Sequence, residues 1–293
     1  MPIDPARLET IRHASDIGRW ELIRCRPDAR LAPYVSDYQG YREWGSATVR
    51  RVEFALPIVP VIINFGPAWS LGDGHKPGRM MRHGSFVAGM YSTYAISENT
   101  GASHCLQFNL TPIGAREIFG IPMHELSERI VDFSDVMGRA GAELETQIAE
   151  AVDWQTRFDI LERFLIGRVA DAQSVSGAVR HAWTRLSDTG GMIPVAALAD
   201  ELQWSRKHLA SKFRQDIGLA PKTIARLLRF RRVVDRQTTD LSSRWAEVAL
   251  DAGYFDQAHL IRDFRQFAGM TPVEFRRSRL ADGSGVIDNV PRG

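Results

Sequence analysis

The stretch that decides the fold of this chain is Ala252-Gly253-Tyr254-Phe255-Asp256-Gln257-Ala258-His259-Leu260-Ile261-Arg262-Asp263-Phe264-Arg265-Gln266, because an earlier stretch repeats it. The earlier stretch runs from Ala199 to Gln215. Identical residues stand 51 positions apart in the two copies: His208/His259, Leu209/Leu260, Phe213/Phe264, Arg214/Arg265, Gln215/Gln266, Gly218/Gly269 and Pro221/Pro272. Ala199 and Ala249 stand 50 positions apart, as expected if the copies differ by one residue in a turn between helices. The repeat therefore predicts two helix-turn-helix units in one domain.

Each copy has the apolar spacing of a short scaffold helix followed by a second helix. The first helices are apolar at positions i, i+3, i+4 and i+7: Val195, Leu198, Ala199 and Leu202 in one copy, Trp245, Val248, Ala249 and Ala252 in the other. The second helices each bury an i, i+4 pair: Leu209 with Phe213, and Leu260 with Phe264. Their N-caps are Ser205 and Asp256, because a short polar side chain there accepts a hydrogen bond from the first turn. After the second helices, Gly218 and Gly269 mark the ends, and Pro221 and Pro272 suit the first turns that follow.

The turn and the connection between the units carry further information. Gly253 suits a left-handed backbone position after a helix, where a side chain costs energy. Gln203 holds the corresponding place in the first unit and must bear that cost or adopt another turn. Between the units, a helix from Pro221 to about Gln237 would form a rod of roughly 24 Å. That length is compatible with two recognition helices held about one DNA turn, ~34 Å, apart.

Charge is unevenly distributed along a chain whose overall composition is ordinary for a globular protein. The whole sequence is 44% hydrophobic and 25% charged, with a net charge of +2. Residues 1–174 carry 18 Lys and Arg against 22 Asp and Glu, whereas residues 175–293 carry 19 against 13. The basic half coincides with the repeat, which favours a polyanion such as nucleic acid as its partner over a merely solvated surface.

The residues that remain after the core is assigned are the candidate contacts to double-stranded DNA. In the first helix-turn-helix unit, the second helix carries Arg206, Lys207, Ala210, Ser211 and Arg214. In the second unit, the second helix carries Gln257, Ala258, His259, Ile261, Arg262 and Arg265. Arg and Gln can each read a base edge through two hydrogen bonds, and Ala and Ile can contact a thymine methyl. Contacts to phosphate are expected from Ser205, Lys212, Arg214, Arg265, Arg276 and Arg277. A solvated charge remains the alternative for any single cation, but recurrence on two helices favours DNA.

The N-terminal half reads as strands followed by helices. Short apolar or alternating runs predict strands at Val52–Leu56, Val59–Phe65, Phe86–Met90 and Cys105–Leu110, typical of a small barrel or sandwich. Helical spacing follows at Leu144, Ile148 and Val152 and at Phe158, Leu161, Leu165 and Val169. We expect an antiparallel helix pair that either forms a dimerisation surface or only covers the barrel.

The segment Ala252–Arg277 resembles the second helix-turn-helix of the AraC/XylS family of bacterial transcription regulators, including its G-x-T-P-x-x-F-R signature at Gly269–Arg276. The resemblance covers about residues 175–280 and implies seven helices. It also implies base contacts from Lys207, Ala210 and Ser211 and from Gln257, Ala258, Ile261 and Arg262. In the first unit Gln203 departs from the pattern, where Gly is frequent.

The N-terminal half resembles, at Leu31–Val35 and Phe108–Ala115, a sensor domain fused to such regulators. Similar domains are cupin-like barrels that bind effectors or form dimers. The expected fold is thus α+β, with an N-terminal cupin-like barrel or sandwich and its helices at 1–172 and an all-α DNA-binding domain at 175–281. Residues 282–293 are expected to form a flexible tail.

An enzyme is the less favoured interpretation. His75, His83, His104 and His124 lack the H-x-H spacing of a cupin metal site, and neither Cys25 nor Cys105 lies in a catalytic motif. We therefore expect no metal, no other cofactor and no catalytic residue. A ligand pocket could be lined by aromatic residues, which are otherwise core: Trp44, Phe54, Phe65, Trp69, Phe86 and Tyr91.

These patterns predict a cytoplasmic, sequence-specific transcription regulator with no membrane segment. Its expected partners are double-stranded DNA, a small-molecule effector bound by the N-terminal domain, RNA polymerase and a second copy of the chain. We expect an activator, although the residues do not separate activation from repression. The alternative is a small-molecule-binding or catalytic cupin-like barrel for which DNA binding is secondary.

Overall fold

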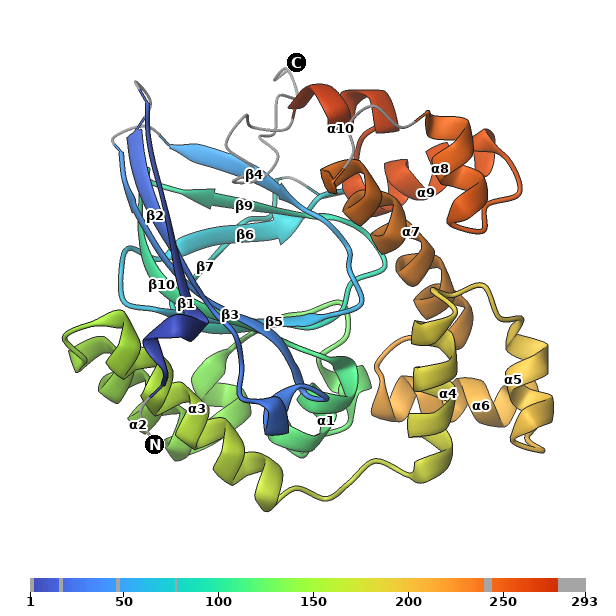
Figure 1. Ribbon diagram of the computed structural model, residues 1–293, viewed down its shortest axis with the longest axis horizontal. Coiled ribbons are helices and arrows are strands. Elements are labelled where there is room, and N and C mark those ends of the chain that lie inside the picture. Colours follow the sequence, from blue (N-terminus) through green and yellow to red (C-terminus); the bar gives the residue numbers. More distant parts are fainter. Residues whose placement is uncertain (1–2, 16–17, 46–47, 77, 240–243, 279–293) are drawn as a thin grey trace.

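The computed structural model describes residues 3–15, 18–45, 48–76, 78–239 and 244–278. A β-rich N-terminal domain is followed by an all-helical C-terminal domain (Figure 1). The predicted α+β order of the two domains is therefore confirmed. The proposed tail at residues 282–293 lies outside the described residues.

Two antiparallel sheets form the N-terminal domain. The larger has the order β1-β2-β3-β10-β5-β8-β11 and the smaller the order β4-β9-β6-β7. The strands are β1 (Leu8–Ser15), β2 (Gly18–Cys25), β3 (Val35–Trp44), β4 (Val49–Glu53), β5 (Val59–Asn64), β6 (Trp69–Asp73), β7 (Met81–His83), β8 (Phe86–Ala88), β9 (Ala95–Asn99), β10 (Ala102–Leu110) and β11 (Ile130–Asp132). This arrangement fulfils the expectation of a barrel or sandwich.

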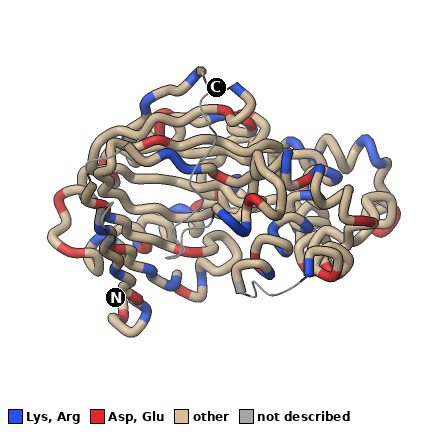
Figure 2. The backbone as a smooth tube through the Cα atoms, turned by 90° about the horizontal axis from the view of Figure 1, so that it is seen from above, with Lys and Arg blue, Asp and Glu red and all other residues tan. Residues whose placement is uncertain are grey.

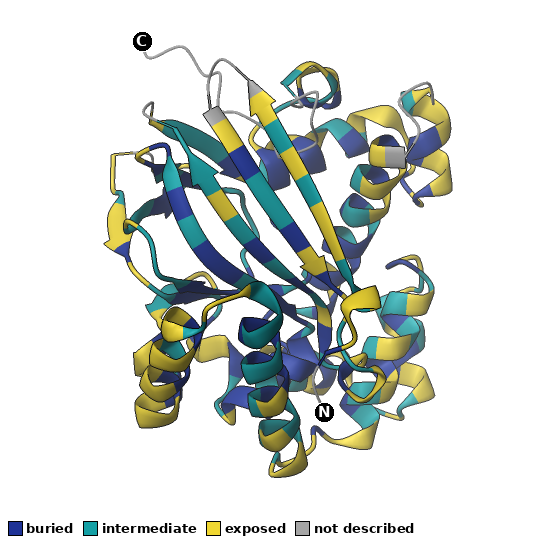
Figure 3. Cartoon of the chain, turned by 60° about the vertical axis from the view of Figure 1, so that its left-hand side comes forward, coloured by how far each residue is buried: buried dark blue, intermediate teal, exposed yellow. Residues whose placement is uncertain are grey.

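Helices cover one face of the larger sheet. They are α1 (Pro112–Phe119), α2 (Phe133–Glu150) and α3 (Trp154–Ala170), with short 3-10 turns at η1 (Pro5–Arg7), η2 (Ala29–Leu31) and η3 (Met123–Glu125). Side chains alternate across the sheet, so Tyr38 packs on Phe158 of α3 while its neighbour Gln39 lies on the opposite face. Helices α2 and α3 expose their outer turns to solvent (Figure 3).

The structure corrects three sequence-based predictions in this domain. Strand β4 ends at Glu53, because Ala55 leaves the sheet and its N–H donates to the carbonyl of Phe267 in the C-terminal domain (2.9 Å). Strand β8 ends at Ala88 instead of Met90. Val152 was expected on the buried face of a helix, but α2 ends at Glu150 and Val152 is 89% exposed.

Seven helices form the described part of the C-terminal domain: α4 (Gly177–Asp188), α5 (Val195–Glu201), α6 (Arg206–Asp216), α7 (Pro221–Thr239), α8 (Trp245–Asp251), α9 (Gln257–Ala268) and α10 (Pro272–Ser278). Helix α7 is the expected linking helix. Its Phe230 is fully buried, with its ring centroid 5.0 Å from that of Phe264 in α9. In α6, Leu209 and Phe213 are also fully buried, so each copy keeps the core that its apolar spacing predicted.

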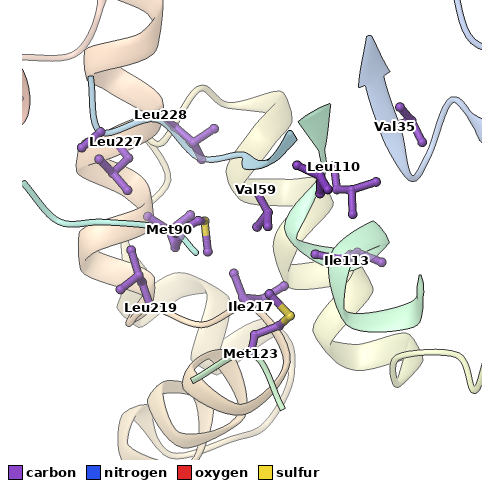
Figure 4. Close-up of a cluster of buried hydrophobic side chains, with 14 of the residues drawn as sticks. Val35, Val59, Met90, Leu110, Ile113, Met123, Ile217, Leu219, Leu227 and Leu228 are labelled. Carbon is purple, nitrogen blue, oxygen red and sulfur yellow. The ribbon is translucent and has the colours of Figure 1, made fainter. Parts of the chain in front are cut away.

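The two domains share buried apolar residues. Figure 4 shows Met90 and Met123 of the N-terminal domain beside Ile217, Leu219 and Leu227 of the C-terminal domain. Each of these side chains is at most 9% exposed. Because burying such side chains removes apolar surface from water, this shared core holds the helix-turn-helix units against the N-terminal domain.

Candidate nucleic-acid interface and sheet cavity

The first helix-turn-helix unit consists of α5 and α6. Its turn places Gln203 at φ 55°, so this residue does adopt the left-handed conformation and bears the cost of a side chain there. The hydroxyl oxygen of Ser205 accepts a hydrogen bond from the N–H of His208 (3.1 Å), which confirms Ser205 as the N-cap of α6. Since the cap uses only the oxygen as acceptor, the Ser205 O–H can still donate to a phosphate.

The second unit consists of α8 and α9 and follows the same plan. Gly253 has φ 80° at the turn, and a Cβ there would lie 2.7 Å from Cγ of Met192. The carboxylate of Asp256 accepts a hydrogen bond from the N–H of His259 (2.6 Å) and caps α9. Gly269 ends α9 in the left-handed conformation with φ 69°. The local signals read from the sequence therefore set the N-terminal ends of both second helices and the C-terminal end of α9.

The side chains expected to meet DNA lie on the surface of α6 and α9. Those that are exposed are Arg206, Lys207, Ser211, Arg214, Gln257, Ala258, Arg262 and Arg265. Those that are partly buried are Ala210, Lys212, His259 and Ile261. Five of the cations have no described carboxylate within 4.0 Å: Arg206, Lys207, Arg214, Arg262 and Arg265. Figure 2 shows basic positions recurring through the helical end of the molecule.

Besides Ser205, three of the expected contact residues also interact within the domain. Lys212 Nζ lies 3.4 Å from Oε1 of Gln215. The ring of His259 packs edge-on against Tyr254, with centroids 5.0 Å apart. The Arg276 guanidinium donates to Oε1 of Gln237 (2.6 Å) and lies 4.7 Å from the ring centroid of Trp245. Its charge is therefore held against the domain, with less freedom than the cations of α6 and α9.

The C-terminal ends of both second helices contact the N-terminal domain. Asp216 of α6 pairs with Arg116 of α1 (3.4 Å), and Gln266 of α9 donates to the carbonyl of Ser92 (3.0 Å). In each helix the anchor is in the last turn, whereas the candidate base contacts begin in the first turn. Helix α7 separates the two units and has 19 residues, or about 28 Å. The anchoring thus leaves the N-terminal turns of α6 and α9 directed away from the sheets.

A cavity of about 520 Å³, here called the sheet cavity, lies between the two sheets. Four of the six aromatic residues proposed for a pocket line it: Phe54, Trp69, Phe86 and Tyr91. Trp44 and Phe65 do not. Trp44 lies beneath the guanidinium groups of Arg19 and Arg42, and Phe65 packs against His104 with ring centroids 4.2 Å apart.

Polar side chains of the sheet cavity were not recognised in the sequence. Gln39 and Gln107 lie directly opposite each other in the pairing of β3 with β10. Arg51 lies 3.0 Å from Glu43, and the hydroxyl of Ser97 donates to Glu53 (2.6 Å). The alternation of polar and apolar residues in β3 and β10 could have indicated that these glutamines share a face. Only the register of the two strands shows that they lie side by side.

Two titratable groups of the N-terminal domain are buried or bonded to a neighbour. Burial raises the pKa of the Cys105 thiol to about 12, so the thiolate is disfavoured. His83, one of the four histidines considered as metal ligands, contacts Asp132, with Nδ1 and Oδ1 2.9 Å apart. Among the described residues, no three His, Cys, Asp or Glu side chains gather as they would around a metal ion. The same part of the chain contains no helix with the length and apolar character needed to cross a membrane.

Two helix-turn-helix units joined by one linking helix, each with an exposed basic second helix, have the architecture of a DNA-binding domain. Residues 198–278 match a family described as a helix-turn-helix domain. Residues 23–132 match a domain of unknown function, DUF6597. The chain therefore carries a helix-turn-helix domain at residues 198–278 behind an N-terminal DUF6597 domain at residues 23–132.

The fold of the chain is similar to three solved structures. ToxT from Vibrio cholerae has a TM-score of 0.47 and 11% sequence identity, over 83% of this chain and 98% of the other. Wild-type ToxT bound to an unsaturated fatty acid has a TM-score of 0.48 and 10% identity, over 86% of this chain and 96% of the other. The AraC-like transcriptional activator CuxR has a TM-score of 0.30 and 15% sequence identity, over 78% of this chain and 85% of the other. No curated protein matches the chain.

Proposed function

We propose that this protein is a sequence-specific transcription regulator that places α6 and α9 in successive major grooves on one face of DNA. The observation that carries this proposal is the anchoring of both helices at their C-terminal ends, by Asp216 and Gln266. An α-helix fits the major groove, and the N-terminal residues of a recognition helix reach the base edges there. The fixed ends and the intervening α7 give the pair a defined spacing.

Base edges would be contacted by Lys207, Ala210 and Ser211 of the first unit and by Gln257, Ala258, Ile261 and Arg262 of the second. The second unit has the stronger set, because Gln257 and Arg262 can each make two hydrogen bonds to one base. Phosphate contacts would come from Ser205, Lys212, Arg214, Arg265, Arg276 and Arg277. Arg265 is assigned to phosphate because it is exposed and follows the last proposed base contact of α9, Arg262.

The proposed function includes a small-molecule effector bound in the sheet cavity. Segment 53–56 and residues 89–91 and 93 line this cavity. The same segments hold α9, because Ala55 N–H bonds to Phe267 and Tyr94 N–H bonds to Gln266 (3.3 Å). A ligand that moves either segment would shift α9 relative to α6, and the affinity for DNA would change with that spacing.

The regulator is further proposed to act in the cytoplasm as a homodimer and to contact RNA polymerase. The exposed outer turns of α2 and α3 offer a surface for the second copy (Figure 3). The alternative of a catalytic barrel has weaker support. Arg51 of the sheet cavity is paired with Glu43, and the raised pKa of Cys105 keeps that thiol protonated.

The experiment that tests the function is selection of binding sites from random DNA by the full chain, followed by gel shifts on spaced variants. Two half-sites about 10 base pairs apart are expected, since α6 and α9 would lie on one face of the duplex. An insertion of five base pairs between the half-sites should abolish the two-site mode by turning one half-site to the opposite face. Enrichment of no common sequence, or indifference to the insertion, would contradict the proposal.

A further inference from the structure

The sheet cavity contains a row of amide side chains that the DNA-binding function does not use. Gln39 of β3 lies opposite Gln107 of β10, and Asp37 lies opposite Asn109 in the same pair of strands. Gln39, Gln107 and Asn109 line the sheet cavity and are here called the amide row. Because strand side chains alternate, the register places all three on the face that meets the smaller sheet.

Hydrogen bonds fix the orientation of the amide row. Oδ1 of Asp37 accepts from Nε2 of Gln39 (2.9 Å) and from Nδ2 of Asn109 (2.9 Å). Oδ1 of Asn109 in turn accepts from Nε2 of Gln107 (3.0 Å). Each glutamine thereby uses one N–H and keeps its second N–H and its carbonyl oxygen. The row therefore offers the sheet cavity hydrogen-bond donors and acceptors side by side, held in place before any ligand binds.

Charged side chains around the sheet cavity are either held by a bonding partner or exposed to water. Arg51 and Glu43 form an ion pair of 3.0 Å, with side chains only 15% and 10% exposed. Glu53 accepts the hydroxyl of Ser97, and Asp37 already holds two amides. Arg24 also lines the cavity but is exposed to water, which screens its charge. A charged group on a ligand would thus lose its hydration in the cavity and meet no described counter-charge that is both buried and without a bonding partner.

Aromatic rings supply the walls on both sheets. Trp20 and Tyr41 of the larger sheet have ring centroids 6.4 Å apart, and Trp69 of the smaller sheet lies 6.2 Å from Phe86. Ring faces of this kind stack on flat aromatic ligands. A volume of about 520 Å³ is in the range that holds a small organic molecule.

We propose that the sheet cavity takes an uncharged aromatic or heteroaromatic molecule whose edge carries a donor and an acceptor, as a carboxamide or lactam does, and that Gln39 and Gln107 read this edge. This ligand class rests on the proposed effector role of the sheet cavity. The aromatic body lies among the ring walls, and the polar edge meets the amide row. Gln39 and Gln107 are accordingly the residues that determine specificity.

The test uses three probes with the same ring system and different charge: 2-naphthamide, 2-naphthoate and 2-naphthylmethylammonium. Their affinities for the full chain are measured by calorimetry at neutral pH. The amide should bind at least tenfold more tightly than either ion. A carboxylate or ammonium probe that binds as tightly as the amide, or failure of all three to bind, would overturn the proposed ligand class.

Two variants separate specificity from folding. Gln39→Leu combined with Gln107→Leu should lower amide affinity about tenfold and leave the two ions nearly unchanged. Trp69→Ala should instead weaken all three probes alike, because it removes part of the wall. Thermal unfolding and binding to the selected DNA site, measured without probe, show whether each variant is folded. If the double variant is folded and keeps the full preference for the amide, the amide row does not read the ligand.

Failure of this inference can be distinguished from failure of the proposed function. DNA binding by the chain without probe tests the regulator directly and does not depend on ligand chemistry. Amide binding with the expected dependence on Gln39 and Gln107 supports the ligand class even if DNA affinity does not respond. In that case the ligand class stands and the proposed coupling to α9 fails.

Discussion

Arg226 of the linking helix α7 and Asp263 of the second recognition helix α9 form an ion pair with Nη2 and Oδ1 2.6 Å apart, and the Asp263 side chain is 1% exposed. The same Arg226 nitrogen donates to Oε1 of Gln266 (2.6 Å), whose amide donates to the carbonyl of Ser92 in the N-terminal domain. The guanidinium also lies 4.8 Å from the ring centroid of Phe267. One arginine thus connects the linking helix, the recognition helix and, through Gln266, the N-terminal domain.

Substitution of Arg226 by Met should be strongly destabilising. The change keeps much of the aliphatic length but leaves the Asp263 carboxylate buried without its counter-charge, which typically costs about 3–5 kcal/mol. Partial exposure of Arg226 (25%) places the expected loss near the lower end. Urea unfolding of the full chain measures the change in the free energy of unfolding.

The control for this pair is the double variant Arg226→Met with Asp263→Leu. Removing both charges should recover a large part of the lost stability, since no unpaired carboxylate remains. Equal losses in the single and double variants would show that the pair contributes through packing alone.

The left-handed turn of the first unit makes an opposite prediction, a gain in stability. Gln203 has φ 55°, so Gln203→Gly relieves the steric cost of a Cβ in this conformation, of order 1 kcal/mol. The greater freedom of Gly in the unfolded chain offsets part of this gain. A net increase of about 0.5 kcal/mol in the free energy of unfolding is expected by urea titration.

Gly253 provides the matched comparison in the second unit. Gly253→Ala introduces a Cβ at φ 80° and 2.7 Å from Met192 Cγ, so it should lower the free energy of unfolding by about 1–2 kcal/mol. Because both turns have the left-handed conformation, the free energy of unfolding should rise with Gln203→Gly and fall with Gly253→Ala. A destabilising Gln203→Gly would mean that the glutamine side chain contributes more than its backbone costs.

Arg262 tests the register of the second recognition helix on DNA. Its side chain is exposed and has no described ion-pair partner. Arg262→Ala should relax base preference at one position and weaken the selected site by about 1–3 kcal/mol. Arg12→Ala is the control, because it removes the same charge from a side chain that is 76% exposed on β1, an edge strand of the larger sheet. Unchanged base preference with Arg262→Ala would move the reading face to other residues of α9.

The helix-turn-helix units could be predicted because their signals are local. Ser205 and Asp256 cap helices within three residues of themselves, and Gly269 ends a helix at its own position. Apolar spacing within one helix likewise reports its own buried face. Such patterns do not depend on distant parts of the chain.

The sheet cavity and the domain contacts could not be read in this way. Gln39 and Gln107 meet only through strand register, and no local pattern links them. The apolar run 52–56 reads as a strand, yet Ala55 gives up sheet pairing to bond with Phe267. Val152 continues a helical spacing beyond Glu150, the residue where α2 ends. In the first two cases, contacts between distant parts of the chain override local propensity.

Stability should depend on pH through His104. Burial, followed by the charges of Arg157 and Arg42, lowers the pKa of His104 from 6.5 to about 4. Its ring packs against Phe65 and Trp154, and the folded form favours neutral imidazole. As pH falls from about 6.5 to about 4, the unfolded chain binds a proton that folded His104 does not. The stabilising contribution of His104 is therefore complete above pH 6.5 and is lost across this window.

The variant His104→Phe should remove this part of the pH dependence. A phenyl ring keeps aromatic contact with Phe65 and Trp154 but does not titrate. Between pH 7 and pH 4.5 the wild-type chain should lose at most about 2 kcal/mol more than the variant, since partial exposure of the imidazole screens the effect. Urea unfolding at both pH values measures this difference, and at pH 8 the two proteins differ only by packing. Parallel pH profiles for the two proteins would show that His104 is protonated equally in the folded and unfolded chains.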